Sequence, residues 1–473
     1  SIPNMVDGLK TSLRKILYCS FKRRLTHEIK VAQFSGYVSE HSAYHHGEAS
    51  LNGAIVNMAQ NFVGSNNINL LEPNGQFGTR LHGGDDSASE RYIFTQLNTL
   101  TRSIFPDADD SVLNYLNDDG TIVEPEYYVP IIPFALMNGI SGIGTGFSCN
   151  IASYNPLTIV DYLNKKLKGK STNNIDFIPY YEGFKGSITR IAEKKYLIKG
   201  VYEKIGDDKI RITELPVGTW TMSYTTYLES LMDGTSKSGK KSTPTIRDFT
   251  SICTEVSVDI TVVFPRGSLC ELEETTDEYG CNGVHKLLKL TTTNSATNMH
   301  MFNKDCRLHK YESIEEIIEE FYLVRMDVYR KRKEFLIKNM NNKLVRLSNR
   351  AKYIQEMLKG TIDLRRKKSL EVTELLESKQ FDKIDNDYKY LIKMPMDSVT
   401  DENVSSIMKE KEDTEIELSV LIKTPLEQMW LHELSVFQTN YNTYKKKREK
   451  IQSGETKPVK RVTKSKVLKI KNK

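Results

Sequence analysis

The chain has 473 residues, of which 38% are hydrophobic and 27% are charged, and its formal net charge is +6. This length is too great for one hydrophobic core and predicts two to four domains. No apolar run approaches the roughly 18 residues of a membrane span, which argues against a membrane protein. The six cysteines lie far apart without a C-x-x-C pair, so we expect reduced thiols and no zinc site.

Positive charge is concentrated at the two ends of the chain. Residues 445–473 hold thirteen Lys or Arg and two Glu, which leaves a net charge of −5 for the rest. The tail 451–473 is predicted to be disordered. Residues 1–30 form a second basic segment, which suits a phosphate backbone but is also typical of a solvated helix face. Its cations are Lys10, Arg14, Lys15, Lys22, Arg23, Arg24 and Lys30.

Residues 1–140 mix short helices with Gly/Asn-rich turns. In GGDDSASERYIFTQL (83–97), the glycines and aspartates predict a turn, and Ser87 or Ser89 could cap a following helix. That helix would place Tyr92 in its first turn, where backbone N–H groups favour negative charge. For an isolated Arg-Tyr pair, a half-buried tyrosine beside a solvated arginine is the commoner arrangement.

Strand-like segments dominate residues 141–312 and predict an α+β domain. GSITRIAEKKYLI, KIRITELPVGTW, SVDITVVF and KLLKLTTT are β-branched, alternating and separated by turns.

Long helices are predicted for residues 313–450. Ser313 and Glu316 form a capping box, and Gly360 is a plausible stop. The apolar spacing between them is that of a coiled-coil seam, interrupted by a basic stretch, and one helix would span roughly 70 Å. Capped helices near Thr400 and at TPLEQMW could return antiparallel along it.

Two segments imitate catalytic motifs. GTSKSGKKS (234–242) has Lys241 where a phosphate loop needs Ser or Thr, so a flexible loop is the better interpretation. DAD (107–109) resembles a metal-binding acidic pair, but we interpret it as a solvated turn. The sequence therefore predicts no complete metal site and no nucleotide site.

Phosphate-binding groups cluster early in the chain. Lys10 and Arg14 are four residues apart and should share a helix face. SAYHHGEASL brings together Tyr44, His46 and Ser50, whose side chains can all donate hydrogen bonds to phosphates.

The motifs follow the order and spacing of one known family. DGLK, YHHGE, AQNFVGSNN, GQFGTRLHGG, RYIFT, NGISGIGTGFS and ITELPVGTWT resemble the breakage-reunion region of eukaryotic-type DNA topoisomerase II. The resemblance covers about residues 1–450 and implies a multidomain α+β fold. Its parts would be a winged-helix DNA-binding domain (1–140), an α/β tower domain (141–312), and a long antiparallel coiled coil with a helical C-terminal dimerisation gate (313–450). Thr11, Asp85 and Glu90 depart from the usual motif residues, and none of them is a reacting group.

The resemblance assigns Tyr92 as the nucleophile that forms a transient 5′-phosphotyrosyl bond with DNA. Arg91 and His46 would stabilise charge on the phosphate, because a tyrosine phenol is largely protonated at neutral pH and needs cationic neighbours. Mg²⁺ and ATP would serve the full-length enzyme. Their sites belong to domains that precede this segment in the family, and the chain, which begins with serine, is expected to be a fragment.

The remaining assignments concern DNA contacts. Lys10, Arg14, Tyr44 and Ser50 would contact phosphates, and Ile143, between two glycines in SGIGTG, would wedge into a base step and bend the duplex. KLTTTNSATN resembles the tower segment that meets DNA, and Trp220 is a weaker candidate. The tower candidates are Lys289, Thr291, Thr292, Asn294 and Asn298.

The expected partners are double-stranded DNA and a second copy of the chain, because cutting two strands needs two tyrosines. One alternative is a module that binds and bends DNA without cleaving it, and another is a purely structural coiled-coil protein. We expect a nuclear location for a cellular enzyme. The compactness of the chain favours a large DNA virus, for which the host cytoplasm is expected.

Overall fold

The computed structural model describes residues 2–234, 243–365 and 367–454. Residues 235–242, which hold most of the segment GTSKSGKKS, and residues 455–473 of the basic tail lie outside this part of the chain. The described residues form two compact units. The first draws on Ser1–Asp107, Leu113–Arg325 and Glu433–Lys473, and the second on Ala108–Val112 and Met326–His432. The finer boundary near residue 140 stays a prediction.

Three helices form the N-terminal part of the first unit: α1 (Thr11–Lys22), α2 (Val31–His41) and α3 (Glu48–Ala59). They pack on one another, and α1 also packs on the hairpin β3 (Tyr115–Asp118) and β4 (Thr121–Pro125) through β4. Ile16, Phe34 and Ile55 are fully buried between them. The apolar faces at helical spacing therefore explain why these segments fold together.

The segment around Tyr92 is not the helix that the sequence predicts. Tyr92 lies in a turn, and Phe94–Thr95 form β2, which pairs antiparallel with β1 (Ile29–Lys30). Ile93 and Thr95 are buried while Tyr92 is exposed and Phe94 half-buried. This period of two, with β-branched residues inside, is typical of a strand and outweighs the capping signal of the serines.

Short helices follow: α4 (Thr101–Ile104), η1 (Asp107–Asp109) and η2 (Phe134–Leu136). The expectation that the DAD segment is a solvated turn is wrong for Asp109. Within the second unit, the Asp109 carboxylate is buried and forms an ion pair of 3.2 Å with Arg332.

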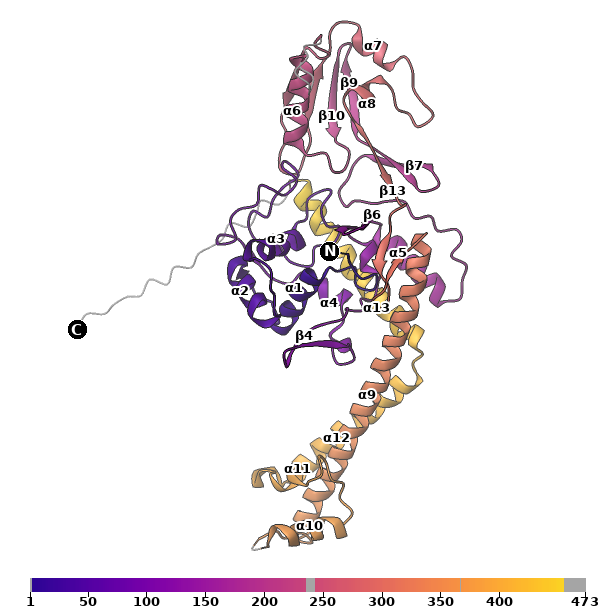
Figure 1. Ribbon diagram of the computed structural model, residues 1–473. Helices are drawn as coiled ribbons and strands as arrows, with labels where there is room; N and C mark the ends of the chain where they lie inside the picture. Colours follow the sequence, from indigo (N-terminus) through magenta and orange to yellow (C-terminus); the bar gives the residue numbers. More distant parts are fainter. Residues whose placement is uncertain (1, 235–242, 366, 455–473) are drawn as a thin grey trace, which may run out of the picture. The chain divides into compact units, whose positions relative to one another are not determined.

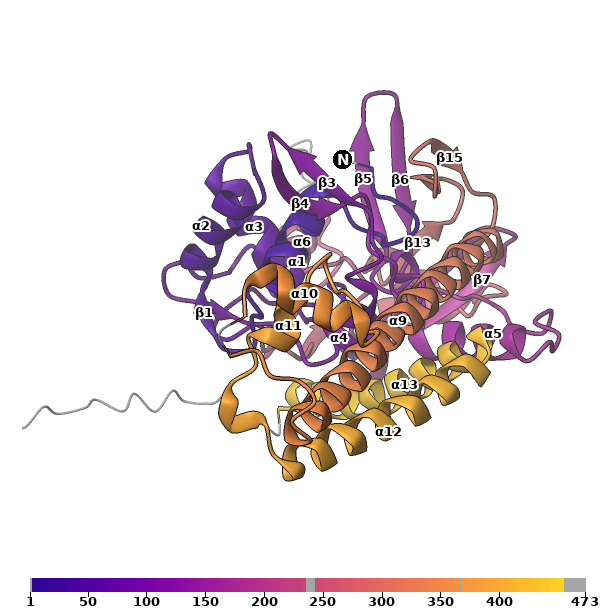
Figure 2. The same cartoon turned by 90° about the horizontal axis from the view of Figure 1, so that it is seen from below.

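A long hairpin, β5 (Ile140–Gly144) and β6 (Phe147–Ile151), reaches outward from the first unit and is followed by α5 (Pro156–Leu167) (Figure 2). The small hairpin β14 (His300–Phe302) and β15 (Leu308–Lys310) lies against β6.

Two sheets make up the predicted α+β part. A four-stranded sheet has the order β11-β12-β10-β9, and a three-stranded sheet has the order β13-β8-β7. Figure 1 labels β9 and β10 of the first sheet and β7 and β13 of the second. Helices α6, α7 and α8 share one apolar core with the larger sheet, which includes Ile212, Leu228 and Val262. The strands are β7 (Ser187–Ala192), β8 (Lys195–Lys199), β9 (Val201–Gly206), β10 (Lys209–Glu214), β11 (Asp248–Ser251), β12 (Ile260–Val263) and β13 (Thr291–Ser295), and the helices are α6 (Thr221–Met232), α7 (Ser268–Glu273) and α8 (Gly283–Leu287).

The predicted strands are confirmed with one correction. In KLLKLTTT, Lys286 and Leu287 end helix α8, and Lys289 adopts a left-handed turn with φ of +49° before β13 begins at Thr291.

One uninterrupted helix, α9 (Ile314–Leu358), runs through the basic stretch, as the prediction of a single long helix requires. The Glu316 amide donates to the Ser313 hydroxyl, and Gly360 follows the helix with φ of +71°, as the capping pattern predicts. In the second unit, Leu347 and Ile354 pack with Val404 and Ile407 of α12 (Asp401–Lys423), and the Lys333 ammonium reaches the carbonyl of Ile422. The two helices therefore run antiparallel. The other elements are α10 (Ser369–Ser378), α11 (Lys389–Ile392), η3 (Met396–Ser398) and α13 (Leu426–Gln452).

Candidate functional site

Tyr92 presents its side chain to solvent from a fixed backbone. Its side chain is 77% exposed, and its amide donates to the carbonyl of Ser89 at 2.9 Å. The preceding residue, Arg91, is also exposed. The buried Ile93 anchors the segment directly after Tyr92, so the phenol stands at the end of a short, well-packed strand.

The first turn of helix α2 holds this strand in place. The amides of Val31 and Ala32 donate to the carbonyls of Ile93 and Glu90, each at 3.1 Å. The first amides of any helix have no partner within the helix, so carbonyls on both sides of Tyr92 fill that deficit. On the other edge, Phe94 and Asn74 exchange two backbone hydrogen bonds of 3.0 and 3.1 Å. Backbone contacts on both edges thus fix Tyr92.

The glycine-rich loop before Tyr92 closes on itself through Asp86. The Asp86 carboxylate accepts from the backbone amide of Thr79 at 2.8 Å and from its hydroxyl at 2.5 Å. Gly78 and Gly84 meet so closely that a Cβ on Gly78 would lie 2.5 Å from the Gly84 carbonyl oxygen. The two glycines are therefore needed for this close backbone approach.

The same loop is tied to the larger sheet and helix α6. Arg80 forms a buried ion pair of 2.5 Å with Glu214 at the end of β10, and the amide of Met222 donates to the carbonyl of Leu81 at 3.0 Å. The Trp220 ring covers Gly83, where a Cβ would lie 2.3 Å from the indole nitrogen. Sequence reasoning missed Glu214 and Asp86, because the residues next to an acid in the sequence do not reveal which partner it meets in the fold.

His46 and Tyr44 lie beside each other, but only His46 is accessible. The imidazole of His46 is exposed and meets the Tyr44 ring edge-on, with 5.4 Å between ring centroids. Tyr44 is only 7% exposed, and its hydroxyl finds no hydrogen-bond partner among the described residues. The expectation that Tyr44 faces a phosphate is therefore not met in this structure, because the ring is drawn into the core under His46. Ser50 is exposed on α3, as a phosphate contact requires.

Lys10 and Arg14 do not share an accessible face. The Arg14 guanidinium is buried and donates to both carboxylate oxygens of Asp7, at 2.6 and 3.0 Å, and to the carbonyl of Leu9. The ion pair with Asp7 raises the pKa of Arg14 against the opposing effect of burial. Its assignment as a phosphate contact is corrected, since its donors already serve Asp7 and Leu9. Lys10 precedes α1 and stays half-exposed.

Ile143 occupies the outer part of the β5–β6 hairpin and is 81% exposed. Asn298 supports this hairpin: its carbonyl accepts from the Asn150 amide at 2.8 Å, and its side-chain amide donates to the Ser148 hydroxyl at 2.5 Å. An isoleucine held in water on a braced hairpin is costly to expose. The arrangement suits insertion of an apolar side chain into a partner.

The tower candidates lie along one stretch of chain. Lys289 is exposed with its ammonium 3.9 Å from the centroid of the Tyr227 ring. Thr291, Thr292 and Asn294 lie on β13, and Asn294 also donates to the Tyr181 hydroxyl at 3.4 Å. Trp220 is half-buried against Phe62 and Gly83, which favours a packing role.

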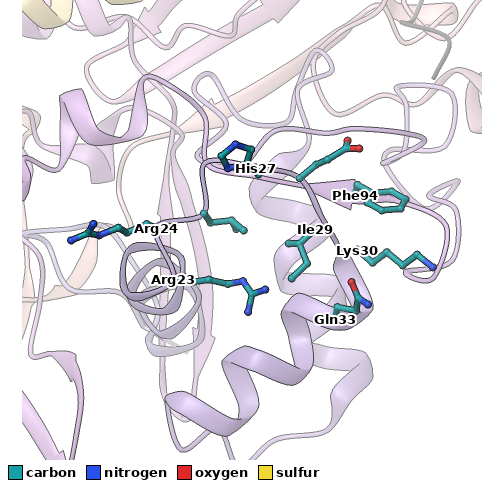
Figure 3. A pocket seen from close by; sticks show the side chains of 9 residues that line it. Arg23, Arg24, His27, Ile29, Lys30, Gln33 and Phe94 are labelled. Carbon is teal, nitrogen blue, oxygen red and sulfur yellow. The ribbon is translucent and has the colours of Figure 1, made fainter. Parts of the chain in front are cut away.

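The other cations of the basic N-terminal segment differ in whether they are paired. Lys15 pairs with Glu124 at 2.8 Å and is largely buried. Arg23, Arg24, His27 and Lys30 instead line an open pocket of about 630 Å³ together with Phe94 (Figure 3).

The described residues contain no group of three or more His, Cys, Asp or Glu side chains arranged to hold a metal ion. None of the described helices is long and apolar enough to cross a membrane.

Comparison with known proteins decides the family. The family model for the A subunit of DNA gyrase/topoisomerase IV matches residues 1–435. The chain belongs to this family of type II DNA topoisomerases. It is 41% identical to DNA topoisomerase 2 of Arabidopsis thaliana and 37% identical to DNA topoisomerase 2-beta of Homo sapiens, and each match covers 92% of this chain.

The topoisomerase fold is found in solved structures as well. The Plasmodium falciparum topoisomerase II DNA-binding, cleavage and re-ligation domain superposes with a TM-score of 0.87 and 36% identity, over 97% of this chain and 63% of that one. The chain spans 31% of the length of the Arabidopsis relative and 28% of the human one. It therefore corresponds to the breakage-reunion region of a type II topoisomerase.

Proposed function

We propose that this chain is the segment of a type II DNA topoisomerase that cuts and rejoins a DNA duplex so that a second duplex can pass. The observation that carries the proposal is Tyr92: an exposed phenol on a backbone that is fixed from both edges. A nucleophile must be accessible to its substrate and held within a narrow range of positions.

In the proposed reaction, the Tyr92 hydroxyl oxygen attacks a backbone phosphorus. A bond forms between this oxygen and phosphorus, and the bond to the 3′ oxygen of the neighbouring nucleotide breaks. The phenol gives its proton to water, and the 3′ oxygen takes up a proton from water and leaves as a 3′-hydroxyl. The 5′-phosphotyrosyl bond conserves the energy of the phosphodiester, and its reversal reseals the strand. Arg91 and His46 are both exposed. Arg91 would supply a positive charge and His46 a hydrogen bond to the phosphate, and both would stabilise the negative charge that develops around phosphorus.

The finer architecture is part of the proposal. The helices α1 to α3 with the β3–β4 hairpin would form the winged helix, and the two sheets with α6 would form the tower. The antiparallel pair α9 and α12 would act as a coiled coil that carries a dimerisation gate. Two chains would act together, one tyrosine for each strand, and Ile143 would bend the bound duplex.

Mg²⁺ and ATP are proposed for the complete enzyme. The described residues offer no group of three or more His, Cys, Asp or Glu side chains, so they do not by themselves fit a Mg²⁺ ion. The nucleus is the proposed location for a cellular enzyme, and the host cytoplasm for a viral one.

A second candidate function is a module that binds and bends DNA but does not cleave it by itself. The braced hairpin that exposes Ile143 favours this candidate, because bending needs no metal ion.

One experiment tests both candidates. The chain and its Tyr92→Phe variant are mixed with an end-labelled duplex and Mg²⁺, with and without the metal-binding domain of a relative, and detergent traps covalent complexes. We expect adducts from the wild-type chain only with the added domain, and none from Tyr92→Phe. Tyr279→Phe, which alters a half-buried tyrosine elsewhere, should behave as wild type. An adduct that survives in Tyr92→Phe would show that another residue is the nucleophile.

A further inference from the structure

The basic pocket in Figure 3 lies beside the strand that carries Tyr92. Arg23 and Arg24 come from the end of α1, His27 and Lys30 from the segment leading into α2, and Phe94 from β2. Lys30 and Phe94 are paired residues in the β1–β2 ladder, and the Lys30 ammonium lies 6.0 Å from the centroid of the Phe94 ring. The pocket is therefore lined in part by β2, the strand that follows Tyr92.

The cations of this pocket are available for a ligand. Arg23 stacks on the Tyr37 ring, with 4.9 Å from its guanidinium carbon to the ring centroid. In the described part of the chain, no carboxylate lies within ion-pair distance of Arg23, Arg24 or Lys30. By contrast, Arg14 and Lys15 of the same basic segment are paired with Asp7 and Glu124. Three cations with one lining acid, Glu28, make the pocket electropositive.

The direction of the side chains relates the pocket to Tyr92. Ile93 and Thr95 point into the core, so Tyr92 and Phe94 project from the opposite, outer face of the segment. Two residues of extended chain span about 7 Å. One nucleotide of a DNA strand rises about 3.4 Å along the helix axis. A strand whose phosphate reaches Tyr92 would therefore bring phosphates one or two nucleotides away to the pocket.

We propose that the Arg23–Arg24–Lys30 pocket binds a DNA backbone phosphate next to the one that Tyr92 attacks, and so helps to set the position of cleavage. This inference rests on the proposed function. The Arg23 guanidinium and the Lys30 ammonium would bind the phosphodiester, and the Gln33 amide in the pocket wall would donate a further hydrogen bond. The Arg24 side chain points away from these three and would add only its charge (Figure 3).

Salt-dependent DNA binding tests the pocket without any need for cleavage. Lys30→Ala is made in the Tyr92→Phe chain, and binding to a short duplex is measured between 50 and 200 mM salt. Loss of one phosphate contact should reduce the magnitude of the salt slope by about 0.9. The affinity ratio between parent and variant should therefore shrink about 3.5-fold over this fourfold range of salt. Lys170→Ala removes an exposed charge after α5 and should leave the slope unchanged.

The length of the DNA locates the contact. Wild type and Lys30→Ala are compared on duplexes shortened one nucleotide at a time towards the cleavage position. This position is mapped from the adduct that wild type forms with the added metal-binding domain. The Lys30 effect should vanish when the last one or two phosphates beyond that position are removed. An effect that persists on the shortest duplex, or a slope equal to that of the Lys170→Ala control, would overturn the proposal.

Two further outcomes distinguish other ligands. Inorganic phosphate at millimolar concentration is titrated into the Tyr92→Phe chain and its Lys30→Ala variant. Lys30-dependent phosphate binding together with an unchanged DNA slope would assign the pocket to a free anion and overturn our proposal. A normal DNA slope with weakened binding of the metal-binding domain would assign it to an acidic protein surface, with the same consequence. Absence of any adduct from wild type in the presence of the added metal-binding domain would refute the proposed function and leave the slope measurement valid.

Discussion

Substitution of Gly83 by alanine tests how closely the loop before Tyr92 depends on Trp220. Gly83 has φ of +70°, and a Cβ there would lie 2.3 Å from the Trp220 indole nitrogen. The left-handed conformation costs a residue with a Cβ about 1–2 kcal/mol. The steric overlap cannot be relieved by a flexible chain end, because the indole is rigid and packed against Phe62. Overpacking of this kind costs about 1–3 kcal/mol, so the total is about 2–5 kcal/mol.

Gly218→Ala is the matched control. Gly218 has φ of +84°, but a Cβ there would meet no atom within 4 Å, so only the backbone cost applies. Thermal unfolding and covalent adduct formation are measured for both variants. We expect Gly83→Ala to unfold at a lower temperature than Gly218→Ala and to form fewer adducts, while both still bind duplex DNA. Equal behaviour of the two variants would refute the argument that the contact between Trp220 and Gly83 positions the loop.

Three other predictions concern separate parts of the chain. Ile143→Ala should bind duplex DNA nearly as wild type does but bend it less, as measured by energy transfer between dyes at the two DNA ends. Unchanged bending would refute the role of Ile143 as a wedge. Arg91→Ala should slow adduct formation by roughly 10²–10³-fold with little loss of DNA binding, since one charge-stabilising donor is removed from the transition state. Burial raises the pKa of the Cys19 thiol to about 12 and that of the Cys149 thiol to about 11. At pH 8 a maleimide should therefore label the exposed Cys270 long before either of them. Early labelling of Cys19 in the folded chain would contradict its burial.

Local signals predict much of the fold correctly. The capping pair at Ser313 and the stop at Gly360 delimit α9, because caps act on their own few neighbours. Alternating β-branched residues likewise predict β7, β8, β10 and β12. The cap at Thr400 predicts a helix that could return antiparallel along α9, and the contacts of α12 with Leu347 and Lys333 confirm this return.

The predictions fail where the conformation of a residue is set by a partner that lies far away in the sequence. The serines near Tyr92 signal a helix cap, but the pairing of Phe94 with Lys30, far away in sequence, makes the segment a strand. Arg14 looks like part of a basic helix face until Asp7 folds back onto it. The sequence suggests that the Tyr44 hydroxyl donates a hydrogen bond to a phosphate, yet the Tyr44 ring is buried beside His46. In each case a tertiary contact overrides a correct local tendency.

The same distinction bears on how the proposed cleavage site is built. The residues with a proposed chemical role, Tyr92, Arg91 and His46, are exposed, so their assignment rests on the sequence motif. The residues that hold them in place are buried and paired over long distances, as Arg80 and Glu214 are. Breaking such a buried pair by removal of one partner typically costs about 3–5 kcal/mol. A substitution at Glu214 should therefore reduce cleavage through the position of the loop, although Glu214 would never touch DNA.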